Sequence, residues 1–289
     1  MQNGVLKNGL NGFQLKIIAI CAMVIDHAAW VFLRPYTENF ALYVLYEILR
    51  GIGRFTMPIM CMLLADGFFY TRSVKKYLIR LFIFALISHV PYYFFDYGIF
   101  SIGSFSIYKF QTSIIFNLFL CLCTLVLLKT EKICAVLKLF GLCLLFLSSW
   151  FCDWRFLPIM LTVLFYVFYK KRFIAIGLYL PVVLIWLFIH HWAGYFMLLL
   201  EKGNPFIFAL QNALPSLIED FPKILPYKLF FIGLFFLIPF FCLYNGKPGN
   251  FKKGSVKAKI SKWFFYVFYP LHLLILAFIK YGNPFIFTD

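Results

Sequence analysis

The chain has 289 residues, of which 63% are hydrophobic and 22% aromatic, and its formal net charge is +16. Soluble domains are about 45–50% apolar, and a membrane β-barrel would show short alternating segments instead of these continuous apolar runs, so both classes are excluded. The lysines and arginines lie between apolar runs, where the anionic cytoplasmic leaflet attracts them, so the charge does not indicate a nucleic-acid partner.

We therefore expect an all-α, polytopic helical membrane protein with about nine spans in a single domain over residues 1–289. The expected spans are residues 15–33, 41–70, 77–95, 112–128, 133–150, 157–169, 173–190, 229–244 and 263–280. The second span is long, and Gly51, Gly53 and Pro58 could bend it. The sixth is short, so that crossing the membrane would draw Asp153 towards it.

The loop charges predict a topology. The turns after the second, fourth, sixth and eighth spans are rich in lysine and arginine, and the other loops carry most of the acids. This pattern places the N-terminus inside and the C-terminus outside, in a multi-pass protein of the cell membrane. The longest stretch between spans, residues 191–227, is then an extracytoplasmic or interfacial segment. The eight cysteines have no metal-ligand spacing, so we expect no metal site.

Among the charged and histidine residues inside the expected spans, five are the candidates for a common site: Asp26, His27, Arg54, Asp66 and His272. A charge at membrane depth costs about 3 kcal/mol or more unless it lines a polar cavity or meets a partner. We expect these residues to line one intramembrane site.

Each of these residues has a chemical and a purely structural interpretation. His27 can take and return a proton near neutral pH, but it could also be a packed neutral histidine bonded to a backbone carbonyl. Arg54 could bind a carboxylate or a developing oxyanion, or it could pair with Asp26, and both can hold together. His272 is either a further group of the site or a packed histidine.

Two further charge groups allow alternatives. Glu47, Arg50 and Arg54 share one helical face, which is also typical of an internal ladder of salt bridges. Asp66 could orient a basic residue or simply end the span. The turn after it could be an ordinary topology signal or a polyphosphate site, and its basic residues are Arg72, Lys75, Lys76 and Arg80. Neither a Walker-type loop nor Gly-x-Ser-x-Gly occurs, which argues against an NTP-driven machine or a serine hydrolase.

Five segments in order resemble a known family. They read KIIAICAMVIDH at residues 16–27, GRFTMPIMCMLLADGFFYTRSVKKYLIRL at 53–81, ISHVPY at 87–92, LYNGKPG at 243–249 and FFYVFYPLHLLIL at 264–276. Together they resemble the TraX family of integral membrane proteins, named for conjugal pilin acetylation. The resemblance is loose over residues 110–226. Asp66 stands where glutamate is common, and Met57 where phenylalanine is common.

The family is similar to a wider group of transmembrane acyltransferases, which includes acyltransferase-three proteins and heparan-alpha-glucosaminide N-acetyltransferase. That similarity implies acetyl-CoA as donor and His27 as the catalytic histidine, with Asp26 beside it. It also implies Arg54 as a cavity arginine and His272 as another polar group of the site. Asp153 fits an aspartate that the family tends to carry.

The resulting hypothesis is an acetyltransferase. Acetyl-CoA would enter from the cytoplasm and bind near Asp66 and Thr71, its phosphates meeting Arg72, Lys75, Lys76, Arg80 and lysines of residues 245–262. The acceptor would be an amine or hydroxyl of a surface glycan, a glycolipid or a pilin-like protein. One alternative is a proton- or anion-coupled transporter, against which stands the lack of paired broken-helix repeats. Another is a structural membrane subunit, whose buried charges would all pair internally.

Overall fold

The computed structural model describes residues 9–98, 111–249 and 255–282, and only the backbone of residues 220–228, 257–259 and 261–262. Its elements are α1 (Gly12–Phe32), η1 (Arg34–Tyr36), α2 (Phe40–Gly53), α3 (Thr56–Tyr70), α4 (Val74–Tyr97), α5 (Ile114–Lys129), α6 (Ala135–Ser149), α7 (Leu157–Val167), α8 (Arg172–Glu201), α9 (Phe206–Ile224), η3 (Leu225–Leu237), α10 (Ile238–Leu243) and α11 (Val256–Tyr281). The described residues contain no strand, only two isolated bridges. The all-α prediction is confirmed.

Polar caps set the start of several helices. Asn11 and Gln14 form a capping box at α1, in which each side chain accepts a hydrogen bond from the backbone N–H of the other, at 2.9 and 3.0 Å. Asn39 caps α2 and Ser73 caps α4 by accepting backbone N–H bonds. Such caps satisfy donors that the helix itself leaves unpaired.

The expected second span is broken into α2 and α3 at Arg54 and Phe55. Pro58 explains the break, because proline lacks an N–H and its ring clashes with the carbonyl four residues earlier, at Arg54. The break places a charged side chain, Arg54, at the junction of the two helices.

Five helical segments of the described chain are long and apolar enough to cross a membrane, namely Gly12–Phe32, Phe40–Tyr70, Val74–Tyr97, Arg172–Glu201 and Trp263–Tyr281. Four apolar segments are shorter: Ile114–Lys129, Ala135–Ser149, Leu157–Val167 and Leu229–Leu243. The 11 residues of α7 rise only about 16 Å, against about 30 Å of hydrocarbon. The chain is thus a helical protein with several apolar helices suited to a membrane, and the count of nine spans and their orientation stay predictions.

The expected boundary after residue 190 is wrong. Helix α8 continues through His190 and His191 to Glu201, and α9 follows. Gly203, with a φ of 81°, ends α8 in a left-handed conformation that suits glycine. Residues 191–227 are therefore helical for most of their length, and their position relative to the membrane stays a prediction.

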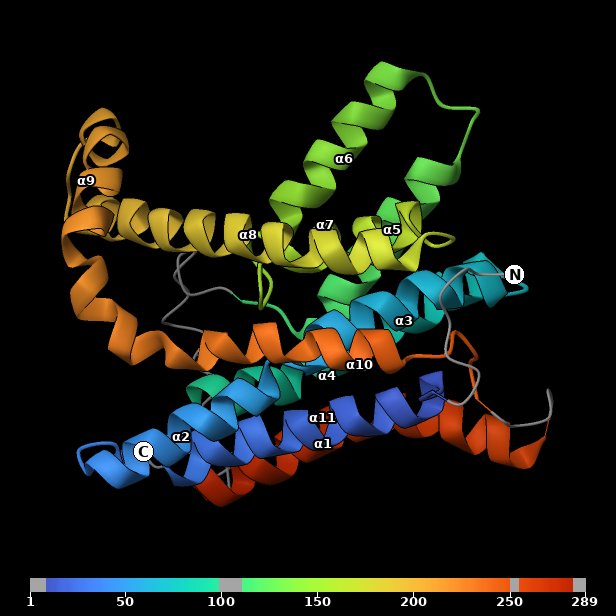
Figure 1. Cartoon of the computed structure of the whole chain (residues 1–289), viewed down its shortest axis with the longest axis horizontal. Coiled ribbons are helices and arrows are strands. Elements are labelled where there is room, and N and C mark those ends of the chain that lie inside the picture. Colours follow the sequence, from blue (N-terminus) through green and yellow to red (C-terminus); the bar gives the residue numbers. More distant parts are fainter. Residues whose placement is uncertain (1–8, 99–110, 250–254, 283–289) are drawn as a thin grey trace, which may run out of the picture.

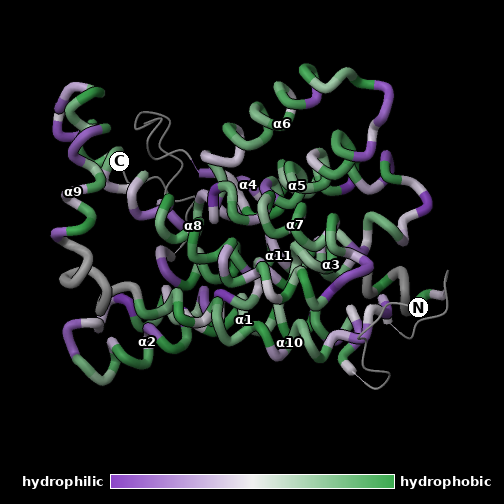
Figure 2. Tube along the Cα trace, turned by 45° about the horizontal axis from the view of Figure 1, so that its top comes forward, coloured by the Kyte–Doolittle hydropathy of each residue, from purple (hydrophilic) through white to green (hydrophobic). Residues whose placement is uncertain are grey.

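The helices form a bundle of interlocking layers (Figure 1). Helix α1 packs against α2, α3 and α11, and α4 packs between α11 and α5. Helix α3 contacts α5 and α7, and α7 in turn supports α8. Most of the helical length is hydrophobic, while hydrophilic residues gather at helix ends and turns (Figure 2).

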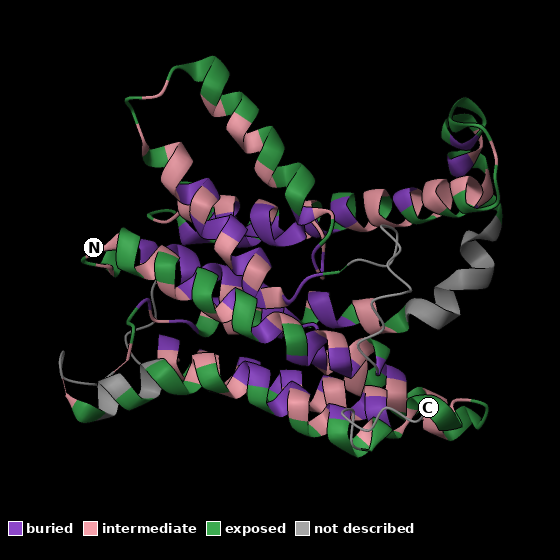
Figure 3. Ribbon diagram, turned by 180° about the vertical axis from the view of Figure 1, so that it is seen from behind, coloured by how far each residue is buried: buried purple, intermediate pink, exposed green. Residues whose placement is uncertain are grey.

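Burial is greatest in the central helices and least in α6 (Figure 3). Most of α3 and α7 is buried, whereas Ser149 is the only buried residue of α6. Helix α6 leans away from the bundle (Figure 1) and leaves large apolar side chains exposed, including Val136, Leu137, Leu139, Phe140 and Leu147. Such a surface suits a hydrocarbon environment.

A glycine contact fastens η3 to α2. A Cβ atom built on Gly233 would overlap the carbonyl of Gly51. Beside this contact, Oε2 of Glu47 accepts a hydrogen bond of 2.9 Å from the backbone N–H of Phe230. The two contacts hold Phe230 next to the arginines of α2.

We expect Gly233→Ala to destabilise the protein by about 1–3 kcal/mol, because the added methyl group must displace the backbone of α2. Thermal unfolding in detergent measures this effect. The matched control is Gly194→Ala on α8, where a Cβ atom meets nothing within 4 Å and helix propensity improves. Equal melting temperatures for the two variants would contradict the close contact.

Candidate active site

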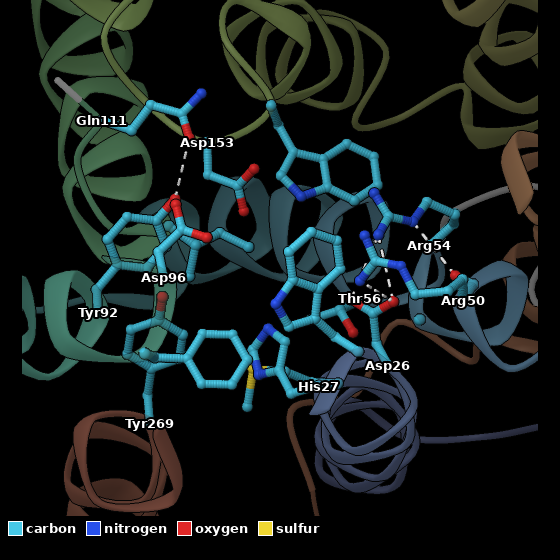
Figure 4. A pocket seen from close by; sticks show the side chains of 16 residues that line it. Asp26, His27, Arg50, Arg54, Thr56, Tyr92, Asp96, Gln111, Asp153 and Tyr269 are labelled. Atoms are coloured by element: carbon cyan, nitrogen blue, oxygen red, sulfur yellow. Dashed lines mark hydrogen bonds and ion pairs between the residues drawn. The ribbon is translucent and has the colours of Figure 1, made fainter. Parts of the chain in front are cut away.

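A cavity of about 150 Å³ lies where α1, the break between α2 and α3, α4, the start of α5, the α6–α7 connection and α11 meet. Most of the polar side chains point into it from opposite sides (Figure 4). Its walls are Met23, Asp26, His27, Trp30, Arg50, Gly53, Arg54, Thr56, Tyr92, Phe95, Asp96, Gln111, Ile114, Asp153, Trp154 and Tyr269.

Asp26 is bound by two arginines. Oδ1 of Asp26 accepts a bond of 2.7 Å from Arg50, and the Nη2 of Arg54 donates to both carboxylate oxygens at 3.2 and 3.3 Å. Gly53 permits this approach, because a Cβ atom there would overlap the Asp26 side chain. The proposed pairing of Arg54 with Asp26 is confirmed, and it joins α1 to the break in the second span.

Aromatic rings cover the Arg54 guanidinium. It lies 4.7 Å from the ring centroid of Trp154 and 4.9 Å from that of Phe230. Its Nε donates to the carbonyl of Arg50 at 3.3 Å. Within the described part of the chain, Nη1 of Arg54 forms no hydrogen bond, so this nitrogen can still donate to a ligand.

The two histidines of α1 and α11 form a directed pair. Nδ1 of His272 lies 3.0 Å from the carbonyl of Phe268, and Nε2 of His272 lies 2.8 Å from Nδ1 of His27. A carbonyl only accepts, so His272 carries its proton on Nδ1 and, when neutral, accepts at Nε2. His27 must then donate from its Nδ1, which leaves the Nε2 of neutral His27 with a lone pair.

The α6–α7 connection presents Asp153 through an unusual turn. Trp154 and Arg155 have φ values of 67° and 48°, which costs about 1–2 kcal/mol for each non-glycine residue. Asn117 compensates by donating from Nδ2 to the carbonyls of both Asp153 and Arg155 at 2.8 Å. The backbone carbonyl of Thr112 accepts a hydrogen bond of 3.1 Å from the backbone N–H of Asp153.

Asp153 and Asp96 face the two arginines across the cavity (Figure 4). Neither carboxylate forms an ion pair within the described residues, in contrast to Asp26. Burial raises the pKa of Asp153 to about 6, although nearby Arg54 acts in the opposite direction. The cavity therefore holds carboxyl groups available to a ligand.

Of the predicted site residues, the structure brings Asp26, His27 and Arg54 to the cavity. His272 does not line it, but it holds His27 from behind. These four residues come from three segments far apart in the sequence, as predicted.

Asp66 lies elsewhere, so the prediction that it shares this site is wrong. It forms an ion pair of 3.1 Å with Arg172 at the start of α8, about 18 Å along α3 from Arg54. Arg172 also donates to the carbonyl of Tyr244 at 3.4 Å. This geometry fits the alternative that Asp66 orients a basic residue.

The basic turn lies about 30 Å along α4 from Asp96. Arg72, Lys75 and Lys76 are exposed there, and the hydroxyl of Thr71 donates within the turn. The guanidinium of Arg80 stacks at 5.1 Å from two tyrosine rings. A role of these residues in binding a cofactor stays a prediction, and Lys252 and Lys253 lie outside the described residues.

Sequence reasoning missed several cavity residues: Arg50, Tyr92, Asp96, Trp154 and Tyr269. Arg50 had a usable signal, because it precedes Arg54 by one helical turn. A ladder with Glu47 was one of two interpretations left open for it, and the structure shows both side chains bonded to other elements. Tyr92, Asp96 and Trp154 lie near span ends, where aromatic and acidic side chains are ordinary. Tyr269 lies inside the last span, and a single tyrosine is no signal in a chain with 18 of them.

Comparison with known proteins gives two matches. The family described as TraX protein matches residues 11–212. A probable fimbrial assembly protein FimC, serogroup H1, from Dichelobacter nodosus is 32% identical over 269 residues, which are 92% of this chain and 94% of that protein. No solved structure matches the chain significantly.

The raised pKa of Asp153 predicts a pH-dependent stability. The folded protein favours the protonated form of Asp153. The contribution of this group to the free energy of unfolding is therefore full below about pH 4 and is lost as the pH rises through about 6. Arg54 and Arg50 oppose the shift, while Asp26 and Asp96 add to it. Asp153→Asn should therefore gain thermal stability relative to the parent protein as the pH rises across this window.

Melting temperatures in detergent at several pH values measure this difference. Glu38→Gln, at an exposed loop position, is the matched control and should show no such trend. A constant difference between Asp153→Asn and the parent protein would contradict the burial of Asp153.

Proposed function

The chain belongs to the TraX family, and from this premise and the cavity geometry we propose that it is a membrane-embedded acetyltransferase. It would move an acetyl group from acetyl-CoA to an amine or hydroxyl of a surface glycan, a glycolipid or a pilin-like protein. The observation that carries the proposal is the directed pair of His27 and His272 beside two arginines in one cavity.

His27 is the general base of this proposal. Its Nδ1 is held by His272, so Nε2 is left to take a proton from the acceptor nucleophile. Ordinary packing requires no second histidine aligned behind the first. The arrangement follows the general pattern of a base oriented by a further group.

Arg54 is the electrostatic partner of the reaction. Asp26 and the carbonyl of Arg50 fix its Nη2 and Nε, while Nη1 stays available. A fixed donor in a water-poor cavity stabilises a developing oxyanion more strongly than the same donor in water.

The chemical step balances as follows. The acceptor nitrogen or oxygen attacks the thioester carbonyl while its proton passes to Nε2 of His27. The tetrahedral intermediate places its oxyanion near Arg54. Collapse breaks the carbon–sulfur bond, and the proton held by His27 passes to the leaving thiolate, which restores the neutral base and releases free CoA.

The two ends of the bundle would serve the two substrates. The cavity of about 150 Å³ accommodates an acetyl group with the acceptor atom, but not a nucleotide. The phosphates of acetyl-CoA would instead meet the exposed cations Arg72, Lys75 and Lys76 at the far end of α4. The name of the Dichelobacter relative, a fimbrial assembly protein, favours a pilin-like acceptor among the candidates.

His27→Ala should lower acetyl transfer by about 10²–10⁴-fold, the usual contribution of a general base. The assay measures transfer of the radiolabelled acetyl group from acetyl-CoA to candidate acceptors in membranes that contain the protein. His89→Ala, at a histidine outside the cavity, is the control. Full activity of His27→Ala would refute the proposed base.

CoA should bind the purified protein in detergent at one site, and the binding should weaken with salt. Arg72→Glu with Lys76→Glu should lower the affinity at least about tenfold, because charged phosphate contacts are lost. The matched control is Lys132→Glu with Lys170→Glu, which reverses two charges that are exposed in other basic turns. Equal loss in both double variants, measured by calorimetry, would contradict a specific site.

A further inference from the structure

Three cations surround one indole at the rim of the cavity. The guanidinium of Arg34 lies 3.8 Å from the ring centroid of Trp30, that of Arg50 lies at 5.1 Å, and the ammonium of Lys280 lies at 5.8 Å. They come from η1, α2 and the end of α11, so tertiary folding gathers them. We call these three residues with Trp30 the rim cluster.

Carboxylates neutralise the rim cluster only in part. Arg34 and Lys280 form no ion pair within the described residues, and the guanidinium of Arg34 donates no hydrogen bond there. Asp96 acts electrostatically on all three cations, but without an ion pair in the described chain. The carboxylate of Asp26, which binds Arg50, is shared with Arg54. Donors of the rim cluster are therefore left for another anion.

Membrane topology does not account for the rim cluster. The lysine-rich turns lie at the opposite ends of α4 and α11, where the positive-inside rule expects them. The rim cluster instead lies where α1 and α11 end, beside the mouth of the cavity. An indole with cations at a helix end is typical of the level of lipid headgroups.

Trp30 and Arg50 belong to both the rim cluster and the cavity wall. A group held by the rim cluster would therefore lie next to the space in which His27 stands. Guanidinium groups match the geometry of phosphate oxygens, and a lysine adds a mobile point charge.

We propose that Arg34, Arg50 and Lys280, gathered around Trp30, form a binding site for a phosphate group at the rim of the cavity. The phosphate belongs either to a lipid headgroup or to a soluble phosphate ester. Binding itself does not depend on acetyl transfer, but in the proposed reaction the site would hold a phosphate-bearing molecule beside His27.

The test uses the full chain with two probes. Phosphatidylglycerol is titrated into phosphatidylcholine nanodiscs, with retained lipid measured by native mass spectrometry. Glycerol phosphate is titrated against the protein in neutral detergent, with calorimetry as the readout. Arg34→Gln with Lys280→Gln should weaken binding at least about tenfold, since two charged contacts are lost.

Two further variants serve as controls. Lys132→Gln with Lys170→Gln removes two exposed cations from other basic turns and should bind like the parent protein. Arg34→Lys with Lys280→Arg keeps both charges and should retain most binding, which separates loss of charge from misfolding. His27→Ala should bind both probes normally, so a failure of the proposed function leaves this test intact.

Each outcome decides the proposal. Loss of phosphatidylglycerol alone in the Arg34→Gln, Lys280→Gln variant assigns the site to a lipid headgroup, and loss of glycerol phosphate as well assigns it to soluble phosphate esters too. The proposal is overturned if the parent protein binds neither probe. It is also overturned if the Arg34→Gln, Lys280→Gln variant binds both probes as tightly as the parent protein does.

Discussion

The ion pairs of Asp26 with Arg50 and Arg54 are the constraint on which the rest of the site depends. Removing one partner from such a buried group leaves an uncompensated charge and costs about 3–5 kcal/mol. The pairs tie α1 to the break between α2 and α3, and that break exists because Pro58 interrupts the helix. Gly53 makes room for the carboxylate. One proline and one glycine thus create a polar centre in a largely apolar bundle.

The same constraint sets the chemistry of the cavity. The carboxylate of Asp26 is bound to the arginines, and its described hydrogen bonds do not include His27, although the two residues are adjacent in the sequence. His27 is oriented instead by His272, which is fixed by a backbone carbonyl of its own helix. Asp153 approaches from the opposite wall on a strained turn that Asn117 stabilises. Strain held by hydrogen bonds is common at functional sites.

Apolar runs are local signals, so the all-α class and most of the helices could be predicted, whereas α9 and the 3-10 helix η3 could not. The group Asp26, His27, Arg54 and His272 could be predicted because buried polar residues are costly. Other features depend on tertiary packing and had no local signal. Asp66 could be separated from the cavity only by locating Arg172. The continuation of α8 past His191 was not predicted, because the prolines and acidic residues of 191–227 suggested that the whole stretch lies outside the spans. The pairing of His27 with His272 rests on the placement of α11 beside α1.

The proton position on His27 tests the central claim most directly. Nitrogen NMR of isotope-labelled histidine in lipid distinguishes the two tautomers, and the five histidines can be assigned with His27→Asn and His272→Asn variants. The account predicts that neutral His27 and His272 both carry the proton on Nδ1, and that His272→Asn abolishes this preference in His27. A proton on Nε2 of His27 in the parent protein would leave no base facing the cavity and would contradict the account.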